Sequence, residues 1–268
     1  MANATINNYA NIFFVEHRVP QTDVVCIFIA GRPQTRVGPH GLFVYLANEL
    51  AANGISSIRF DNSGWGDSPK KRLDYHDSWQ DIKEVIKYCK NQNSNSKIVL
   101  LGLCDGATAA ILSLPHCKNI DGLILLNPYI ENDSAESGAK ISDYYLPQLK
   151  NIKNYFRLLK TPVELPKKIF EFVVHWKNAR SCDSHIASQN IIKLLQNNKL
   201  PTTFIFSSND ITASQAKIQL KSWLSTNPKN IKVKNIEQAD HTFSKPLNKN
   251  DLFNLIKNSN CLNSLLNK

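Results

Sequence analysis

Short apolar runs alternate with amphipathic helical patterns along most of the chain, and this alternation limits the fold more than any other feature. Clear apolar runs are "DVVCIFIAG" (23–31), "ISSIRF" (55–60), "KIVLLGL" (97–103) and "DGLILLNPYI" (121–130). Strands that alternate with helices are typical of a mostly parallel sheet with helices on both faces. We therefore predict an α/β fold whose functional side chains lie at the carboxyl ends of its strands.

The alternation stops between residues 131 and 185. That segment contains two amphipathic helical patterns and no convincing strand, so it is predicted to be a helical lid inserted into the fold. Beyond it the sequence predicts elements at 188–198 (helix), 201–208 (strand), 214–225 (helix), 230–237 (strand) and 249–266 (one closing helix). The expected organisation is a core of residues 1–130 and 186–268 with a lid of residues 131–185.

Composition limits the class of protein. Hydrophobic residues make up 42% of the 268, yet no apolar run approaches the roughly 20 residues that span a bilayer. The start, "MANATINNYANIFF", has neither the basic beginning nor the apolar middle of a secretory signal. The six cysteines are scattered without CxxC spacing, which argues against disulfides and a zinc cluster. We expect a soluble, cytoplasmic protein.

The formal net charge of +10 comes mostly from lysines scattered among asparagines. No basic run is interleaved with stacking aromatics, so nucleic acid is not the expected partner. Residues 140–180 hold nine basic and three acidic residues, a net charge of +6. This excess is either a solvated face of the lid or a contact surface for coenzyme A or an acyl carrier protein.

The segment "GLCDGAT" (102–108) follows an apolar run and precedes a small-residue helical stretch. A strand, a tight turn between glycines and a helix whose N-terminus faces the turn form a nucleophile elbow, normally with the pattern GxSxG. Here Cys104 takes the place of serine, and the helix N-terminus favours its thiolate. We predict that Cys104 is a nucleophile, whereas Cys26 and Cys89 fill the core as small apolar groups.

Two further residues follow Cys104 in the order that an elbow requires, first an acid and then a histidine. Asp210 ends "FIFSSND" and His241 ends "NIEQADH", each after a predicted strand. Asp210 has the simpler alternative role of capping the next helix, and Asp133 is the fallback acid. The expected catalytic set is Cys104, His241 and Asp210.

The loop "IAGRPQTRVG" after the strand at 23–31 is expected to complete an oxyanion hole. The backbone amide of Asp105 is one predicted donor, and that of Arg32 is the other, since Gly31 permits a close approach. Arg32 and Arg36 are candidates for contact with an anionic substrate group, and His40 is a candidate substrate contact.

The chain resembles the α/β-hydrolase superfamily over nearly its whole length. "RFDNSGWGDS" is similar to the superfamily segment RxDxxGxGxS, in which Asp61, Gly64, Gly66 and Ser68 mainly build a turn. More narrowly, "PQTRVGPHGLFVYLANELAANGI" followed by "GLCDGA" resembles hydrolases found beside exosortase systems and thioesterase-like relatives. The resemblance implies acyl transfer through a covalent intermediate, with no metal and no cofactor.

A cysteine nucleophile favours an acyl thioester as substrate, because the acyl-cysteine is itself a thioester and the exchange is nearly isoenergetic. The expected function is therefore a thioesterase-like acyl hydrolase. Two alternatives stay open: an acyltransferase, since polyester synthases of the superfamily also use GxCxG, and a binding protein on a hydrolase scaffold. The acyl chain length, the acceptor, the pathway and the oligomeric state are not encoded in these patterns.

Overall fold

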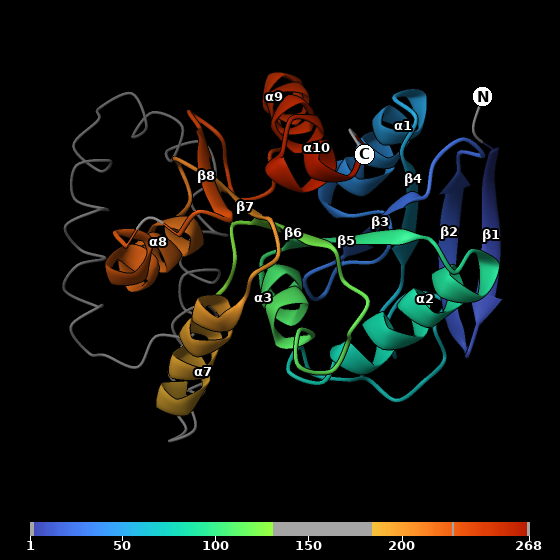
Figure 1. Ribbon diagram of the computed structural model, residues 1–268, viewed down its shortest axis with the longest axis horizontal. Helices are drawn as coiled ribbons and strands as arrows, with labels where there is room; N and C mark the ends of the chain where they lie inside the picture. Colours follow the sequence, from blue (N-terminus) through green and yellow to red (C-terminus); the bar gives the residue numbers. More distant parts are fainter. Residues whose placement is uncertain (1–2, 131–183, 227, 267–268) are drawn as a thin grey trace, which may run out of the picture. The chain divides into compact units, whose positions relative to one another are not determined.

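The computed structural model describes residues 3–130, 184–226 and 228–266. Apart from its last two residues, the predicted lid lies outside these residues. The described residues form an eight-stranded sheet in the order β1-β2-β4-β3-β5-β6-β7-β8 (Figure 1). The strands are β1 (Asn3–Tyr9), β2 (Ile12–Arg18), β3 (Val24–Ile29), β4 (Ser56–Phe60), β5 (Lys97–Leu103), β6 (Gly122–Leu126), β7 (Thr202–Ser207) and β8 (Ile231–Ile236).

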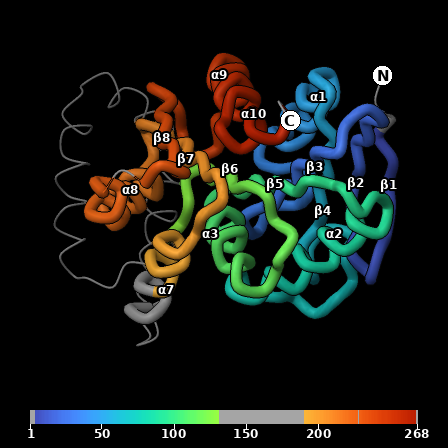
Figure 2. The backbone as a smooth tube through the Cα atoms, viewed as in Figure 1, coloured from blue at the N-terminus to red at the C-terminus, as the bar shows by residue number. Residues whose placement is uncertain are grey.

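The six neighbouring strands β4, β3, β5, β6, β7 and β8 run parallel, while β2 pairs antiparallel with both β1 and β4. Helices cover both faces (Figure 1, Figure 2). One face carries α1 (Leu42–Ala52), α9 (Pro246–Lys257) and α10 (Asn260–Leu266), and the other carries α2 (Trp79–Gln92), α3 (Asp105–Leu112), α7 (Ser184–Asn197) and α8 (Ile211–Leu224). This is the predicted α/β-hydrolase fold.

Strand β5 shows why the central runs are apolar throughout. Its alternate residues enter different cores: Ile98 and Leu100 pack with α2 and α3, whereas Val99, Leu101 and Leu103 pack with α1 and α9. Because successive side chains of a strand point to opposite faces, a strand covered on both sides presents few side chains to solvent and is mostly apolar. The carboxyl end of β5 is thereby fixed between two cores, and Cys104 follows it directly.

Two elements differ from the sequence prediction at the ends of the described chain. The polar sequence "NATINNY" does not predict strand β1. In the structure Ile6 of this strand is 72% exposed, so the strand forms by pairing with β2 and not by burial. The predicted closing helix 249–266 is two helices, because Asn258 ends α9 outside helical geometry. The Cys261 thiol then donates to the carbonyls of Leu123 (3.0 Å) and Pro201 (3.1 Å), which holds α10 against the sheet.

The segment "RFDNSGWGDS" builds a buried turn after β4. Asp61 is fully buried, and its carboxylate accepts the backbone N–H of Arg36 (2.7 Å) and of Asp67 (3.0 Å). A side chain at Gly66 would overlap this carboxylate. Ser68 donates to the carbonyl of Asp61 at 2.8 Å. These residues shape the loop at the carboxyl edge of the sheet, as the resemblance implied.

Within the described residues, every helix is too short or too polar to cross a lipid bilayer. The same part of the chain has no cluster of three or more His, Cys, Asp or Glu side chains that could hold a metal ion.

Candidate active site

Cys104 stands at a sharp turn between β5 and α3. Its backbone has φ 59° and ψ −126°, a conformation that residues other than glycine rarely adopt. The Cys104 amide donates to the carbonyl of Leu126 (3.0 Å), and its carbonyl accepts from the amides of Ala107 (3.0 Å) and Tyr129 (3.1 Å). These bonds hold the strained turn, and the side chain remains partly exposed to solvent.

Both glycines of the pattern GxCxG are required by close backbone contacts. A Cβ atom at Gly102 would overlap the carbonyl of Gly106 and the backbone of Ala107, and one at Gly106 would overlap the carbonyl of Ile29. Gly102 therefore lets α3 fold back on β5, and Gly106 lets α3 approach the end of β3. The predicted elbow geometry is present.

The structure brings His241 and Asp210 together although 31 residues separate them. His241 Nδ1 lies 2.7 Å from Asp210 Oδ2; the Asp210 side chain is 6% exposed and that of His241 is 32% exposed. Asp210 also caps α8, accepting from the amides of Thr212 (3.1 Å) and Ala213 (3.0 Å). The two alternative roles that the sequence allowed for Asp210 are thus compatible in one side chain.

The environment of His241 raises its pKa. Burial alone would lower the pKa, but the hydrogen bond to Asp210 and the interaction with the Cys104 side chain outweigh it and raise the pKa to about 10. The Asp210 carboxylate and the Cys104 side chain therefore both favour the protonated imidazole. A histidine cation beside a cysteine is the arrangement that favours a thiolate nucleophile.

Asn127 is part of the site that sequence reasoning missed. It follows β6 directly in a left-handed conformation (φ 41°), and its side chain is fully buried. Its Nδ2 donates to the carbonyl of His241 (2.9 Å) and to Ser207 Oγ (2.8 Å). The available signal was a polar residue directly after the apolar run "GLILL", at the edge where the site lies.

The loop after β3 differs in detail from the expected oxyanion hole. Gly31 lies close to the Cβ of Cys104, as predicted, but the Arg32 amide donates to Asp105 Oδ1 at 3.0 Å. Arg32 Nε donates to the other carboxylate oxygen of Asp105 (3.0 Å), and Arg32 Nη1 pairs with Asp74 (2.9 Å). The second predicted oxyanion donor therefore already has a partner, because the residue after the nucleophile is acidic.

The side chains of Arg36 and His40 do not approach Cys104 through any described hydrogen bond. The Arg36 guanidinium pairs with the buried Asp61 and, at 2.6 Å, with Asp67. Its charge is neutralised within the turn after β4, and its expected contact with substrate stays a prediction. The His40 side chain is exposed, and its carbonyl accepts from Lys249 (2.7 Å).

Comparison with protein-family models assigns the chain. The Hydrolase_4 model, described as "Serine aminopeptidase, S33", matches residues 36–243. The chain belongs to the Hydrolase_4 family. The family description names a serine enzyme, whereas this member has Cys104 at the elbow. No curated protein matches the sequence.

Solved structures show the same fold at low sequence identity. An esterase from Pyrococcus furiosus has a TM-score of 0.69 at 17% identity, covering 99% of this chain and 91% of its own. A thioesterase domain from the curacin biosynthetic pathway has a TM-score of 0.60 at 16% identity, with 96% and 99% covered. An α/β serine hydrolase without a lid from Xanthomonas campestris has a TM-score of 0.58 at 14% identity, with 96% and 92% covered. The Hydrolase_4 chain therefore has the α/β-hydrolase fold.

The other described thiols of this Hydrolase_4 member are buried. Burial raises the pKa of Cys89 to about 12 and that of Cys117 and Cys261 to about 11, and it raises the pKa of Cys26 still further. Buried thiols with raised pKa values are poor nucleophiles at neutral pH. Among the described cysteines, Cys104 alone combines partial exposure with a histidine partner.

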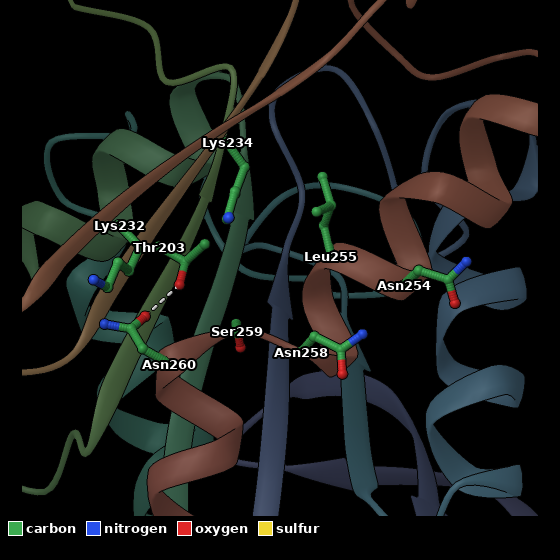
Figure 3. A pocket seen from close by; sticks show the side chains of 8 residues that line it. All are labelled: Thr203, Lys232, Lys234, Asn254, Leu255, Asn258, Ser259 and Asn260. Atoms are coloured by element: carbon green, nitrogen blue, oxygen red, sulfur yellow. Dashed lines mark hydrogen bonds between the residues drawn. The ribbon is translucent and has the colours of Figure 1, made fainter.

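A hollow of about 180 Å³ lies between β8 and the junction of α9 and α10 (Figure 3). Lysine and polar side chains line most of it, and Figure 3 shows Lys232 and Lys234 opposite Asn254 and Leu255. None of the predicted site residues of this Hydrolase_4 chain borders it.

Proposed function

We propose that the chain is a cysteine-dependent acyl hydrolase that acts on an acyl thioester through an acyl-Cys104 intermediate. One observation carries the proposal: Cys104 occupies the strained turn between β5 and α3 beside His241, whose ring is held by Asp210 at 2.7 Å. Nucleophile, base and orienting acid are the three parts of a covalent acyl-transfer site.

The first half-reaction begins with the Cys104 proton on His241. The thiolate Sγ forms a bond to the carbonyl carbon of the substrate, and the carbonyl electron pair moves onto oxygen. When that oxyanion collapses, the C–S bond of the substrate breaks, and the leaving thiolate takes the proton from His241. The products of this step are acyl-Cys104 and a free thiol.

The second half-reaction uses water. His241 removes a proton from the water as its oxygen attacks the acyl carbon, and the second oxyanion collapses with loss of Cys104 Sγ. The carboxylic acid leaves, and the proton remains in the Cys104–His241 pair. Asp210 keeps Nδ1 of the imidazole protonated, so that Nε2 faces the reacting atoms.

The oxyanion is proposed to lie at the N-terminus of α3 against the Asp105 amide. The amide of Arg32 serves as second donor once it exchanges the Asp105 carboxylate for the oxyanion. Charge–dipole stabilisation at a helix N-terminus is favourable in both half-reactions.

The thioester substrate class is supported by chemistry and by structural likeness. Exchange of one thioester for another is nearly isoenergetic, which suits a cysteine nucleophile. The fold is shared with a thioesterase domain and with an esterase. We further propose that residues 131–185 form a lid whose basic residues contact coenzyme A or an acyl carrier protein. His40 is proposed to contact the substrate. The enzyme is also proposed to be cytoplasmic and related to exosortase-system hydrolases.

Intact-protein mass spectrometry tests the proposal. The protein is incubated with a panel of acyl thioesters of N-acetylcysteamine that differ in chain length. We expect a mass increase of one acyl group on Cys104 that decays in water, and no increase in Cys104→Ala. Cys104→Ala labelled as strongly as wild type would place the acyl group elsewhere, and an unlabelled, inactive wild type across the panel would reject the thioester proposal.

Cysteine at the elbow also favours an acyltransferase as second candidate, since an acyl-cysteine persists long enough to meet another acceptor. The same experiment separates the two functions. An acyl-Cys104 that is stable in water and is discharged only by an added thiol, alcohol or amine indicates transfer. A protein that neither accepts acyl groups nor reacts with a thiol-directed electrophile at Cys104 is a binding protein.

A further inference from the structure

The nucleophile and the base of this site come from strands that do not touch. Cys104 follows β5 and His241 follows β8, and in the sheet order β6 and β7 lie between them. Other contacts must therefore set the distance between the loop that carries Cys104 and the loop that carries His241. Residues 126–129, which comprise the last residue of β6 and the three residues after it, are hydrogen-bonded to both loops.

On the nucleophile side, this segment holds the elbow from two directions. The carbonyl of Leu126 accepts the Cys104 amide at 3.0 Å, and the amide of Tyr129 donates to the Cys104 carbonyl at 3.1 Å. The hydroxyl of Thr108 in α3 donates to the carbonyl of Tyr129. The backbone of Cys104 is therefore fixed relative to the end of β6.

On the base side, the contact is made by the Asn127 side chain. Its Nδ2 donates to the His241 carbonyl (2.9 Å) and to Ser207 Oγ (2.8 Å), and its Oδ1 accepts the Ser207 amide (2.8 Å). Ser207 Oγ in turn donates to the carbonyl of Asp240 (2.8 Å). Asn127 thus binds the end of β7 and the His241 loop at once, and its buried amide is fully satisfied.

We propose that Asn127 is a positioning residue that sets His241 relative to Cys104; this rests on the catalytic roles assigned above. Without its amide, the His241 carbonyl loses its donor, and the loop between β8 and α9 keeps its bonds to residues 207–210 without this anchor on the His241 backbone. A displacement of about 1 Å between reacting groups costs on the order of 100-fold in rate. Asn127 touches no reacting atom, so its effect is on alignment and not on substrate binding.

The test compares two substitutions of Asn127 with one control. Asn127→Gly removes the amide and accepts φ 41° without strain, and Asn127→Asp keeps the shape but has no N–H to donate. The matched control is Asn248→Ala, because Asn248 is also buried and donates to a carbonyl of the same loop, that of Gln238, at 3.3 Å. Thermal unfolding of each variant identifies those that are folded.

The readouts are kcat and KM for a short acyl thioester and the iodoacetamide alkylation rate of Cys104 from pH 6 to pH 9.5. We expect Asn127→Gly to lower kcat about 10–100-fold with KM within threefold, and to lower the alkylation rate at pH 6 relative to pH 9.5. Asn127→Asp should lose activity similarly. Asn248→Ala should change stability without changing the pH profile.

Either an unchanged kcat and pH profile in a folded Asn127→Gly, or the same changes in Asn248→Ala, overturns the positioning role. If wild type turns over no thioester, the proposed function fails by itself. The alkylation profile then still decides the inference, because it reports the Cys104–His241 pair without any substrate. Under those conditions a profile of Asn127→Gly that coincides with wild type rejects the inference, and a shifted one supports it.

Discussion

Asp210→Asn separates the two roles of the buried carboxylate. Asparagine caps a helix about as well as aspartate, and its single carbonyl oxygen can still accept an amide at the start of α8, although not both of the amides that the two oxygens of Asp210 accept. The charge that stabilises protonated His241 and fixes its tautomer is lost. In a serine protease, the equivalent change costs about 10⁴ in kcat. We expect kcat/KM for a short thioester to fall by about 10²–10⁴ while the protein remains folded.

The stability effect of this substitution depends on pH. The pKa of His241 is about 10 in the folded protein, and an ordinary histidine has about 6.5. The folded state therefore holds a proton that the unfolded state releases between these values. The resulting stability is fully present below about pH 6.5 and is lost as pH rises towards 10.

At about 1.36 kcal/mol per pH unit the entire rise corresponds to about 5 kcal/mol. Part of it comes from Cys104, and solvent reaches a ring that is 32% exposed, so we expect about 1–2 kcal/mol for Asp210. Chemical denaturation should show wild type more stable than Asp210→Asn by this amount near pH 6, with the difference vanishing near pH 10.

Asp210→Ala is the matched control. It also removes the helix cap, so it should cost about 1 kcal/mol more than Asp210→Asn at every pH. A kcat/KM of Asp210→Asn within threefold of wild type, or a stability difference that is constant from pH 6 to pH 10, would refute the reasoning. Loss of activity in Asp133→Asn with an active Asp210→Asn would make Asp133 the acid.

Limiting iodoacetamide at neutral pH should modify Cys104 before Cys261, because burial raises the pKa of the Cys261 thiol to about 11. Peptide mass spectrometry measures the order of modification, and earlier modification of Cys261 would contradict the prediction. Gly106→Ala should cost several kcal/mol or prevent folding, because the new methyl group meets the carbonyl of Ile29. The methyl group added by Gly54→Ala meets no neighbouring atom, so this control should cost only about 1 kcal/mol of stability, from its positive φ. Equal losses of Tm in Gly106→Ala and Gly54→Ala would contradict the packing argument. The triple variant Lys150→Glu, Lys153→Glu and Arg157→Glu reverses charge in the predicted lid. It should raise KM for a carrier-bound thioester at low salt and leave turnover of a small neutral thioester unchanged. Equal loss of activity on both substrates would reject the carrier contact.

The sequence predicts the elements of this fold that depend on local patterns. The run "KIVLLGL" is apolar because both of its faces are buried, and the glycine spacing around Cys104 follows from close backbone packing. The placement of Asp210 and His241 after their strands also follows from local pattern and chain order, and the structure puts their side chains in contact. Their catalytic roles stay predictions.

Contacts between distant segments could not be predicted in the same way. The bond from the Arg32 amide to Asp105 spans 73 residues, and that from Asn127 to His241 spans 114. Each depends on which strand ends meet and on side-chain rotamers, neither of which has a periodic signal in the sequence. Strand β1 was missed for a related reason, since its pairing partner, and not its own composition, makes it a strand.

The face of the sheet that carries α1 has a consequence for biosynthesis. Its core joins Cys26 and Phe28 of β3 to Cys261 and Leu262 of α10, so early and late parts of the chain complete one apolar layer. During translation, β3 leaves the ribosome long before α10 exists, and the part of the layer that α9 and α10 cover stays exposed until these helices have been made. An exposed apolar sheet face is a site for aggregation and for chaperone binding. A stalled nascent chain that ends before Pro246 should therefore bind chaperones. A longer nascent chain, in which α9 and α10 have emerged from the ribosome, should no longer bind them.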